Sequence, residues 1–302
     1  MIYIEDSIMQ KGKAATAGSK ILKNFTAPFD ATVFTRLAEK CESVKLAEFG
    51  LGDPGELPGS PLLCNDVFGY VRLRAVEQDL CYIRPSYGTV SRYGLIPTAS
   101  SMDQIGVVCK NPIQGFSLLA KIAGHDEKDG VMFPEKSYSY KAEKKDIKIE
   151  NITDCAVHHA DICTQVMNIL AYAEISNNIS RYDGIKFGYR TSNYKGLDDL
   201  YTKTRTEAFG LETKLAAIMG CLILSQEYYA EYYEKAMKIR RLIKESLLFE
   251  TYNVLIIPPD SPLAVLTGLP SLTFQHKGSG IQLMADVKKE SMLLSAWEAM
   301  QS

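Results

Sequence analysis

The stretch at residues 83–106, IRPSYGTVSRYGLIPTASSMDQIG, decides the fold, and the segment directly after it carries clear structural signals. The apolar run at residues 105–110, IGVVCK, predicts a buried strand. Asn111 and Pro112 then supply an N-cap and a first helical residue, and the pattern predicts a helix that reaches Ile122. The sequence therefore predicts a strand that is followed at once by a helix.

Helical and strand-like patterns alternate outward from this stretch, which predicts an α/β protein. The helical patterns lie at residues 31–42, 153–172, 210–249 and 288–300. The strand-like runs lie at residues 252–258, 271–274 and 280–285, and the last two predict a strand pair. In the first helical pattern we expect Asp30 to be the N-cap and one face to carry Val33, Phe34, Leu37 and Cys41.

Composition indicates a globular protein without a strong electrostatic bias. The 302 residues are 46% hydrophobic and 23% charged, which is enough apolar material for a substantial core. The 34 basic and 36 acidic residues are mixed along the chain, and the formal net charge is −2. This balance excludes a global field that would attract nucleic acid or an anionic membrane.

The cysteines and the first residues favour a cytoplasmic location. Seven cysteines, an odd number without any CxxC pair, predict free thiols in a reducing compartment. The start of the chain, MIYIEDSIMQKGK, has acidic residues where a signal peptide has a basic segment and then an apolar one. No run approaches 18 apolar residues, so we expect a cytoplasmic protein without a membrane span.

Residues 50–55, GLGDPG, fit the letters GxGxxG of a dinucleotide site. That site requires a helix to begin at the glycines, and Pro54 with the residues after it opposes a helix. We therefore expect a plain loop and no cofactor.

Cys155, His159 and Cys163 fall at i, i+4 and i+8 of a predicted helix, with His158 beside them. Such a stripe contains residues that bind zinc. Three ligands on one helix span about 12 Å, however, which is too far to converge on one ion. We expect a partly buried helix face and no metal.

The stretch at residues 83–106 resembles the amidase signature family, and within it the A subunits of the glutamyl-tRNA(Gln) and aspartyl-tRNA(Asn) amidotransferases. The resemblance lies in the motifs VSRYG at residues 90–94 and ASSMDQIG at residues 99–106. It continues in chain order through residues 5–37, 122–129, 176–190, 206–214, 225–244 and 268–272. The resemblance implies a single domain over residues 1–302, with a mixed, twisted sheet flanked by helices and shortened by internal deletions.

The family hydrolyses amides with a lysine, a bridging serine beside a cis peptide bond, and a nucleophilic serine. By the resemblance, Glu5 stands at the position of the lysine and Tyr70 at that of the nucleophile. The glycine- and serine-rich loop that would carry the bridging serine after residues 58–60 is absent. Because base and nucleophile are both replaced, we expect the Ser-cisSer-Lys triad to be lost.

Parts of the nucleophile motif persist as Asp66, Gly69 and Arg72. The resemblance also places Met167 and Ala216 where the family holds its glutamine substrate with a tyrosine and an arginine. The segment at residues 259–266 is too short to supply the family's acidic substrate contact. We therefore expect the substrate contacts to be lost as well.

The chain also lacks parts of the family's sheet. Residues 41–49 do not contain the family's strand sequence, and much of the family's middle is missing between residues 130 and 153. Lost strands leave unpaired sheet edges, which another chain readily covers. We expect such edges and the tyrosine-rich helix at residues 228–241 to be contact regions.

The leading hypothesis is a catalytically inactive pseudo-amidase that acts by binding proteins. The resemblance implies the B and C subunits of the amidotransferase, or an active A subunit, as partners, with tRNA reached only through them; a homo-oligomer is another expected outcome. One alternative is a divergent amidase or transamidase subunit in tRNA-dependent glutamine or asparagine formation. A further alternative is an eroded paralogue without activity, although the well-formed helix caps argue against it.

Overall fold

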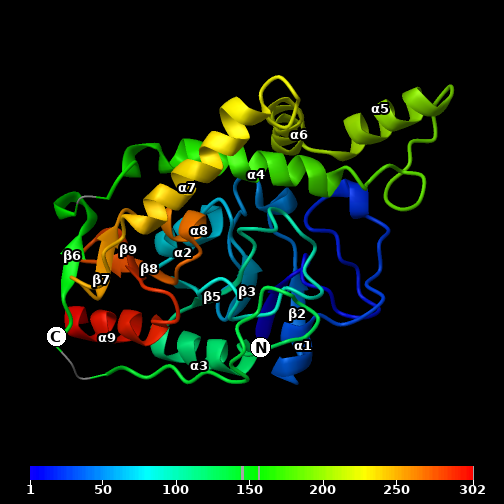
Figure 1. Cartoon of the computed structure of the whole chain (residues 1–302). Coiled ribbons are helices and arrows are strands. Elements are labelled where there is room, and N and C mark those ends of the chain that lie inside the picture. Colours follow the sequence, from blue (N-terminus) through cyan, green and yellow to red (C-terminus); the bar gives the residue numbers. More distant parts are fainter. Residues whose placement is uncertain (144–145, 156, 302) are drawn as a thin grey trace.

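One continuous sheet runs through the protein, and strands from both ends of the chain belong to it (Figure 1). The computed structural model describes residues 1–143, 146–155 and 157–301. Within these residues the sheet has nine strands in the order β2-β1-β3-β5-β4-β8-β9-β7-β6. In chain order they are β1 Ile2–Glu5, β2 Cys41–Val44, β3 Leu62–Asn65, β4 Cys81–Arg84, β5 Ile105–Cys109, β6 Ile149–Asn151, β7 Val254–Ile257, β8 Ser271–His276 and β9 Ser279–Ala285.

The sheet is mixed. β1 is parallel to both of its neighbours, β2 and β3, and β6 is parallel to β7. The other neighbouring pairs are antiparallel, and they include the predicted β8–β9 pair. The predicted α/β fold with a mixed sheet flanked by helices is therefore confirmed.

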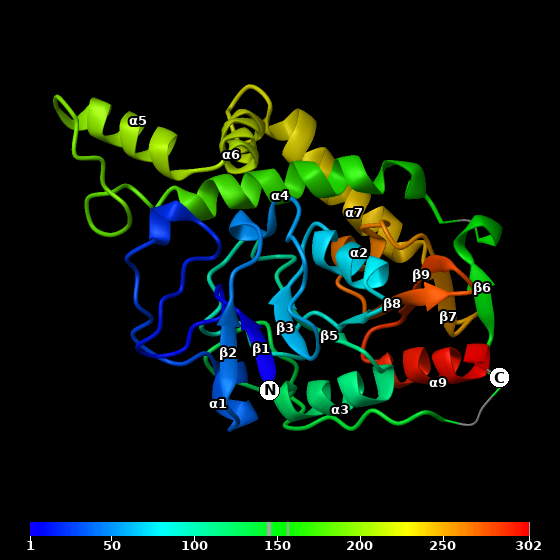
Figure 2. The ribbon, with the colours of Figure 1, turned by 180° about the vertical axis from the view of Figure 1, so that it is seen from behind.

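Helices cover both faces of the sheet (Figures 1 and 2). On one face lie α1, α3 and α9; on the other lie α2, α8, α4 and α7, with α6 on the outer side of α4. None of the helices formed by the described residues has the length and apolar character needed to cross a bilayer. Their bounds are α1 Thr32–Leu37, α2 Tyr70–Glu77, α3 Pro112–Ile122, α4 Cys163–Ile179, α5 Leu197–Ala208, α6 Leu211–Ile223, α7 Lys235–Glu245, α8 Leu263–Thr267 and α9 Glu290–Gln301.

The central strands are buried because helices cover them on both sides. Every residue of β3, β4 and β5 is buried. The side chain of Asn111 accepts a hydrogen bond from the Ile113 backbone N–H at 2.8 Å, and Pro112 begins α3. β5 and α3 thus form the strand–helix unit that the sequence predicts.

Residues 31–42 form a short helix and then a strand, and the prediction of one helix is wrong. α1 ends at Leu37 because Ala38 adopts a φ of 51°, which no right-handed helix can continue. Asp30 is not the N-cap, since Ala31 occupies that position. The predicted helix face with Cys41 therefore does not exist.

Cys41–Val44 instead forms β2, so the predicted loss of a strand in this segment is wrong. β2 and β6 are the two edges of the sheet and are only four and three residues long. The Lys13 ammonium also donates a hydrogen bond to the carbonyl oxygen of Cys41 at 3.1 Å. Short strands and a covering lysine are ordinary ways of protecting an edge.

One predicted helical stretch is shorter than its pattern, and another, for which we expect one or two helices, forms two. α4 begins only at Cys163, so the first part of residues 153–172 is not in it. Residues 210–249 form α6, then a π-helical segment at Tyr229–Glu234, then α7. The strand at residues 252–258 and the C-terminal helix are confirmed as β7 and α9.

Candidate functional site

The carboxyl ends of the parallel strands β1 and β3 meet inside the protein. Glu5 ends β1 and Asn65 ends β3. The register pairs Ile4 with Leu63, which brings Glu5 beside the end of β3. The Asn65 backbone N–H donates a hydrogen bond to Oε2 of Glu5 at 2.8 Å, and Glu5 is only 4% exposed. The parallel pairing thus holds a carboxyl group in the core.

Burial raises the pKa of the Glu5 carboxyl to about 8, because removal from water disfavours the charged form. The hydrogen bond from the Asn65 N–H and the nearby Ser7 hydroxyl lower this pKa, whereas the charges of Asp6 and Asp66 raise it. At pH 7 the group is therefore mostly a neutral acid. A neutral acid can donate a proton but cannot remove one, so Glu5 offers no base at this pH.

Asp66 organises the turn between β3 and α2. Its carboxylate accepts hydrogen bonds from the backbone N–H groups of Gly69, Val71 and Arg72 at 3.0, 3.1 and 3.3 Å. Gly69 has a φ of 90°, which suits glycine because it has no Cβ. These three N–H groups at the start of α2 therefore already have an internal acceptor and are not aimed at a substrate oxyanion.

Tyr70 begins α2 at the protein surface and is 43% exposed. It lies near Tyr172, whose pKa is raised by burial and further by the Tyr70 phenol. Glu5 is buried, and within the described part of the chain no hydrogen bond joins Tyr70 to Glu5 or to any other base. A nucleophile needs a base within hydrogen-bond reach, so the two side chains do not form a nucleophile–base pair.

Arg72 ties this turn to the C-terminal part of the chain. It is 1% exposed, and its Nη1 lies 3.5 Å from the Asp66 carboxylate. Its Nε donates to the carbonyl oxygen of Pro259 at 2.9 Å. Its Nη2 donates to the carbonyl oxygens of Ser261 and Asp260 at 2.9 and 3.3 Å. The segment after β7 is thereby fixed against α2.

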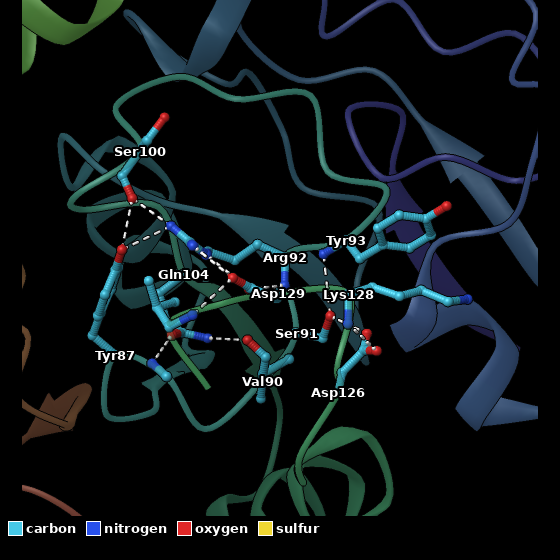
Figure 3. Close-up of polar contacts among 12 residues, drawn as sticks. Tyr87, Val90, Ser91, Arg92, Tyr93, Ser100, Gln104, Asp126, Lys128 and Asp129 are labelled. Carbon is cyan, nitrogen blue, oxygen red and sulfur yellow. Dashed lines mark hydrogen bonds and ion pairs between the residues drawn. The ribbon is translucent and has the colours of Figure 1, made fainter. Parts of the chain in front are cut away.

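A second polar site lies outside the positions that the sequence predicts. It is a cavity of about 200 Å³ formed by the loop of residues 92–103 and by residues 128–129 (Figure 3). Its lining consists of Arg92, Tyr93, Leu95, Pro97, Ser100, Asp103, Lys128 and Asp129. A cavity with this mixture of charges can hold a small polar ligand only if its arginine is free to bind one. The hydrogen bonds of Arg92 therefore decide whether the cavity is a binding site.

Arg92 is fully engaged by the protein itself. Its Nε and Nη2 donate to the two carboxylate oxygens of Asp129 at 3.0 and 2.7 Å (Figure 3). Its Nη1 donates to the Tyr87 hydroxyl and to the carbonyl oxygen of Ser100 at 2.8 and 2.5 Å. Burial raises the pKa of the Asp129 carboxyl, but the hydrogen bonds and the charge of Arg92 together outweigh this effect. The pKa of Asp129 therefore lies below its ordinary value. The pair is a clamp between two segments of the chain.

Comparison with known proteins agrees with this architecture. A family model described as Amidase matches residues 63–153 and 147–288. The A subunit of the glutamyl-tRNA(Gln) amidotransferase of Lachnoclostridium phytofermentans is 32% identical over 333 residues, covering 87% of this chain and 67% of the relative. The chain belongs to the amidase family.

Other relatives and solved structures of the amidase fold extend this result. The corresponding A subunit of Listeria monocytogenes is 33% identical, covering 86% of this chain and 68% of the relative. The crystal structure of the A subunit from Thermotoga maritima superposes with a TM-score of 0.74 at 24% identity, covering 97% of this chain and 81% of that one. The peptide amidase of Stenotrophomonas maltophilia gives 0.73 at 18% identity, covering 100% and 82%. At these identities the structural likeness concerns the fold.

Met167 and Ala216 are core residues in this amidase-family chain. Met167 lies in α4 and is 2% exposed, and Ala216 lies in α6 and is fully buried. They belong to two separate apolar clusters.

The stripe of Cys155, His159 and Cys163 does not form in this amidase-family chain, and its prediction is wrong. Cys155 follows a 3-10 turn, His159 has a φ of 60°, and α4 starts only at Cys163. No group of at least three histidine, cysteine, aspartate or glutamate side chains is placed to hold a metal ion within the described residues. Residues 50–55 lead into a loop and β3 and not into a helix, so no dinucleotide turn forms there.

The buried Glu5 carboxyl predicts how stability depends on pH. Its folded pKa of about 8 lies above the ordinary 4.5, so the folded state loses stability as pH rises between these values, by about 1.4 kcal/mol per unit. Glu5→Gln imitates the neutral acid and should remove this loss. Urea unfolding at pH 5 and pH 8.5 should therefore show little difference between variant and wild type at pH 5, and a variant that is several kcal/mol more stable at pH 8.5.

The control for this experiment is Glu77→Gln, which removes an exposed carboxyl from α2. Its difference from wild type should be the same at both pH values. An equally constant difference for Glu5→Gln would show that Glu5 ionises normally in the folded protein.

The Arg92 clamp gives a second stability prediction. Arg92→Ala leaves the Asp129 carboxylate without its cation and should lower the free energy of unfolding by about 2–3 kcal/mol, less than for a fully buried pair because the Arg92 side chain is 18% exposed. Arg74→Ala breaks a surface pair with Asp53 and should have little effect. Equal effects of the two substitutions in chemical denaturation would contradict the clamp.

Proposed function

We propose that this chain is a catalytically silent member of the amidase family that acts by binding other proteins. The observation that carries the proposal is the state of Glu5. The residue that the resemblance assigns to the position of the family's lysine is a buried carboxyl with a pKa of about 8. A group that is protonated at pH 7 cannot deprotonate a nucleophile at that pH.

The surroundings of Tyr70 support the same proposal. Amide hydrolysis needs a nucleophile, a base in contact with it, and N–H donors aimed at the developing oxyanion. Tyr70 is exposed at the start of α2, whereas Glu5 lies in the core. The backbone N–H groups on either side of Tyr70 are bound to the Asp66 carboxylate. The base and the nucleophile are thus not supplied by the residues that the resemblance assigns to these roles, and the two N–H groups beside Tyr70 are already bound.

The partners we propose are the B-type and C-type subunits of an amidotransferase, or an active A-type subunit. The support is the name of the relatives, which describes each of them as one subunit of an amidotransferase and thus as part of an assembly. With a net charge of −2, contact with tRNA is proposed only through such partners. Seven free cysteines support the cytoplasm as the proposed location.

The rival function is that of a divergent amidase, or of a transamidase subunit with relocated chemistry. A carboxyl whose pKa is raised to about 8 is the kind of group that serves as a general acid or base, and this observation favours the rival. However, Glu5 is only 4% exposed and its Oε2 is bound to the Asn65 N–H. A catalytic role would need a substrate to reach that buried position.

Turnover measurements separate the two functions. We expect the purified protein to release no ammonia from glutamine or asparagine, and no amine from aryl amides, at pH 7, where Glu5 is mostly protonated. Turnover that is abolished by Tyr70→Phe or by Glu5→Gln would contradict the proposal and support the rival enzyme. If the protein is inactive and its isolation from the native cell recovers no partner, the eroded paralogue becomes the better account.

A further inference from the structure

α6 exposes its large apolar side chains to solvent. Its inward side carries Thr213, Ala216, Gly220 and Ile223 and packs on α4. A Cβ added to Gly220 would lie 2.1 Å from the carbonyl oxygen of Tyr172, so α6 approaches α4 very closely there. The outward side carries four large aliphatic residues that are 75, 52, 67 and 44% exposed, namely Leu211, Leu215, Ile218 and Leu222.

These four residues form what we call the α6 seam. Both views of the protein show α6 on the outer side of α4, away from the sheet (Figures 1 and 2). The seam is extended by further exposed apolar side chains after α6, namely Leu224, Tyr229 and Tyr232. A contiguous apolar surface of this kind on a folded protein marks an interaction site.

The spacing of the seam indicates that its partner is a helix. Leu211, Leu215, Ile218 and Leu222 follow one another at intervals of four, three and four residues. This is the a/d repeat of a coiled coil, in which each apolar residue inserts between residues of a facing helix. A membrane surface is a poorer fit, because interfacial helices carry several basic residues and α6 has one lysine and one glutamate.

The spacing of the seam is the same in both directions, which points to a second copy of the chain. When a second α6 is turned antiparallel and centred between Ala216 and Ala217, Leu211 lies opposite Leu222 of the other copy and Leu215 lies opposite its Ile218. All four positions then meet an aliphatic partner. We propose that two copies of this chain associate through an antiparallel pairing of their α6 seams, as a two-fold dimer.

The charges beside the seam fit the same arrangement. Glu212 and Lys214 are the charged residues of α6. In the antiparallel pair both lie at the level of the neutral residues Met219 and Cys221 of the other copy, so no like charges meet. Because α6 is only about 20 Å long, a stable interface also needs the apolar residues beyond its ends. The antiparallel pair brings Leu211 at the start of α6 in one copy toward the Leu224 end of α6 in the other.

This dimer rests on the proposed binding role, but its test is independent of catalysis. Sedimentation velocity of the full chain over a range of concentrations should show a species of twice the chain mass. Leu215→Glu with Ile218→Glu places charges in the centre of the seam and should weaken dimerisation by roughly 100-fold or more. The matched control is Ile113→Glu, which changes a 49% exposed aliphatic residue on α3, on the other face of the sheet, and should leave the dimer intact.

Cysteine cross-linking tests the direction of the pairing in a Cys221→Ser background. Neither Leu211→Cys nor Leu222→Cys alone should form a linked dimer, because identical positions lie about 16 Å apart along an antiparallel pair. A mixture of the two variants should form a linked heterodimer on mild oxidation. Linking of each variant with itself would show a parallel pair and overturn the arrangement.

Other results of these experiments would also decide whether the α6 seam forms a dimer. A wild-type chain that stays monomeric, or a dimer that persists with Leu215→Glu and Ile218→Glu, overturns the proposal. Circular dichroism of the double variant should match that of wild type, since both side chains are exposed in the single chain. Its unfolding midpoint should match that of wild type at concentrations where the wild type is monomeric. If the double variant loses binding to anionic vesicles or to an added B-type subunit while the wild type never dimerises, the seam serves that partner and not a second copy.

Discussion

The hydrogen bond from the Asn65 backbone to the buried Glu5 carboxyl joins the ends of β1 and β3, and much of the surrounding structure follows from this junction. Because β3 ends there, the Asp66 turn and the start of α2 are placed beside it. α2 then carries Arg72 to the carbonyl oxygens of residues 259–261. One connected set of polar contacts therefore runs from the first strand to the C-terminal half of the sheet.

The same contacts explain why the chain combines an amidase fold with the proposed loss of amidase chemistry. A catalytic centre needs polar groups that stay available to a substrate, at some expense of stability. Here the polar groups of this region bind one another: Asp66 holds the N–H groups of α2, and Arg92 holds Asp129. In our account the large apolar side chains that remain without a partner lie on the surface, above all on the α6 seam.

The sequence predicts those features that depend on local patterns. The β5–α3 unit follows from an apolar run and the Asn111–Pro112 cap, and both lie within a few residues. The prediction of one helix at residues 31–42 fails because the end of α1 depends on the left-handed conformation of Ala38, which residue propensity does not indicate. The stripe at Cys155 fails for a similar reason, since the backbone turns at His159 before α4 begins.

The candidate site required tertiary information. The resemblance assigns Glu5 to a catalytic position, but its burial and protonation depend on β3 and on the helices around it. Arg92 and Asp129 both lie in segments of the family resemblance, yet they are 37 residues apart and their pairing leaves no mark in the sequence. Pairs of residues that are far apart in the sequence, such as Arg92 and Asp129, can therefore be recognised only once the folded structure is known.

The state of Glu5 can be measured directly, and it is the most direct test of the account. A pH titration by carbon-13 NMR, with labelled glutamate carboxyl carbons and Glu5→Gln to identify the signal, reports the protonation of this one group. Our account predicts a midpoint near pH 8. A midpoint near the ordinary value of 4.5 would mean that Glu5 is charged at pH 7, and it would contradict the proposal that burial has silenced this position.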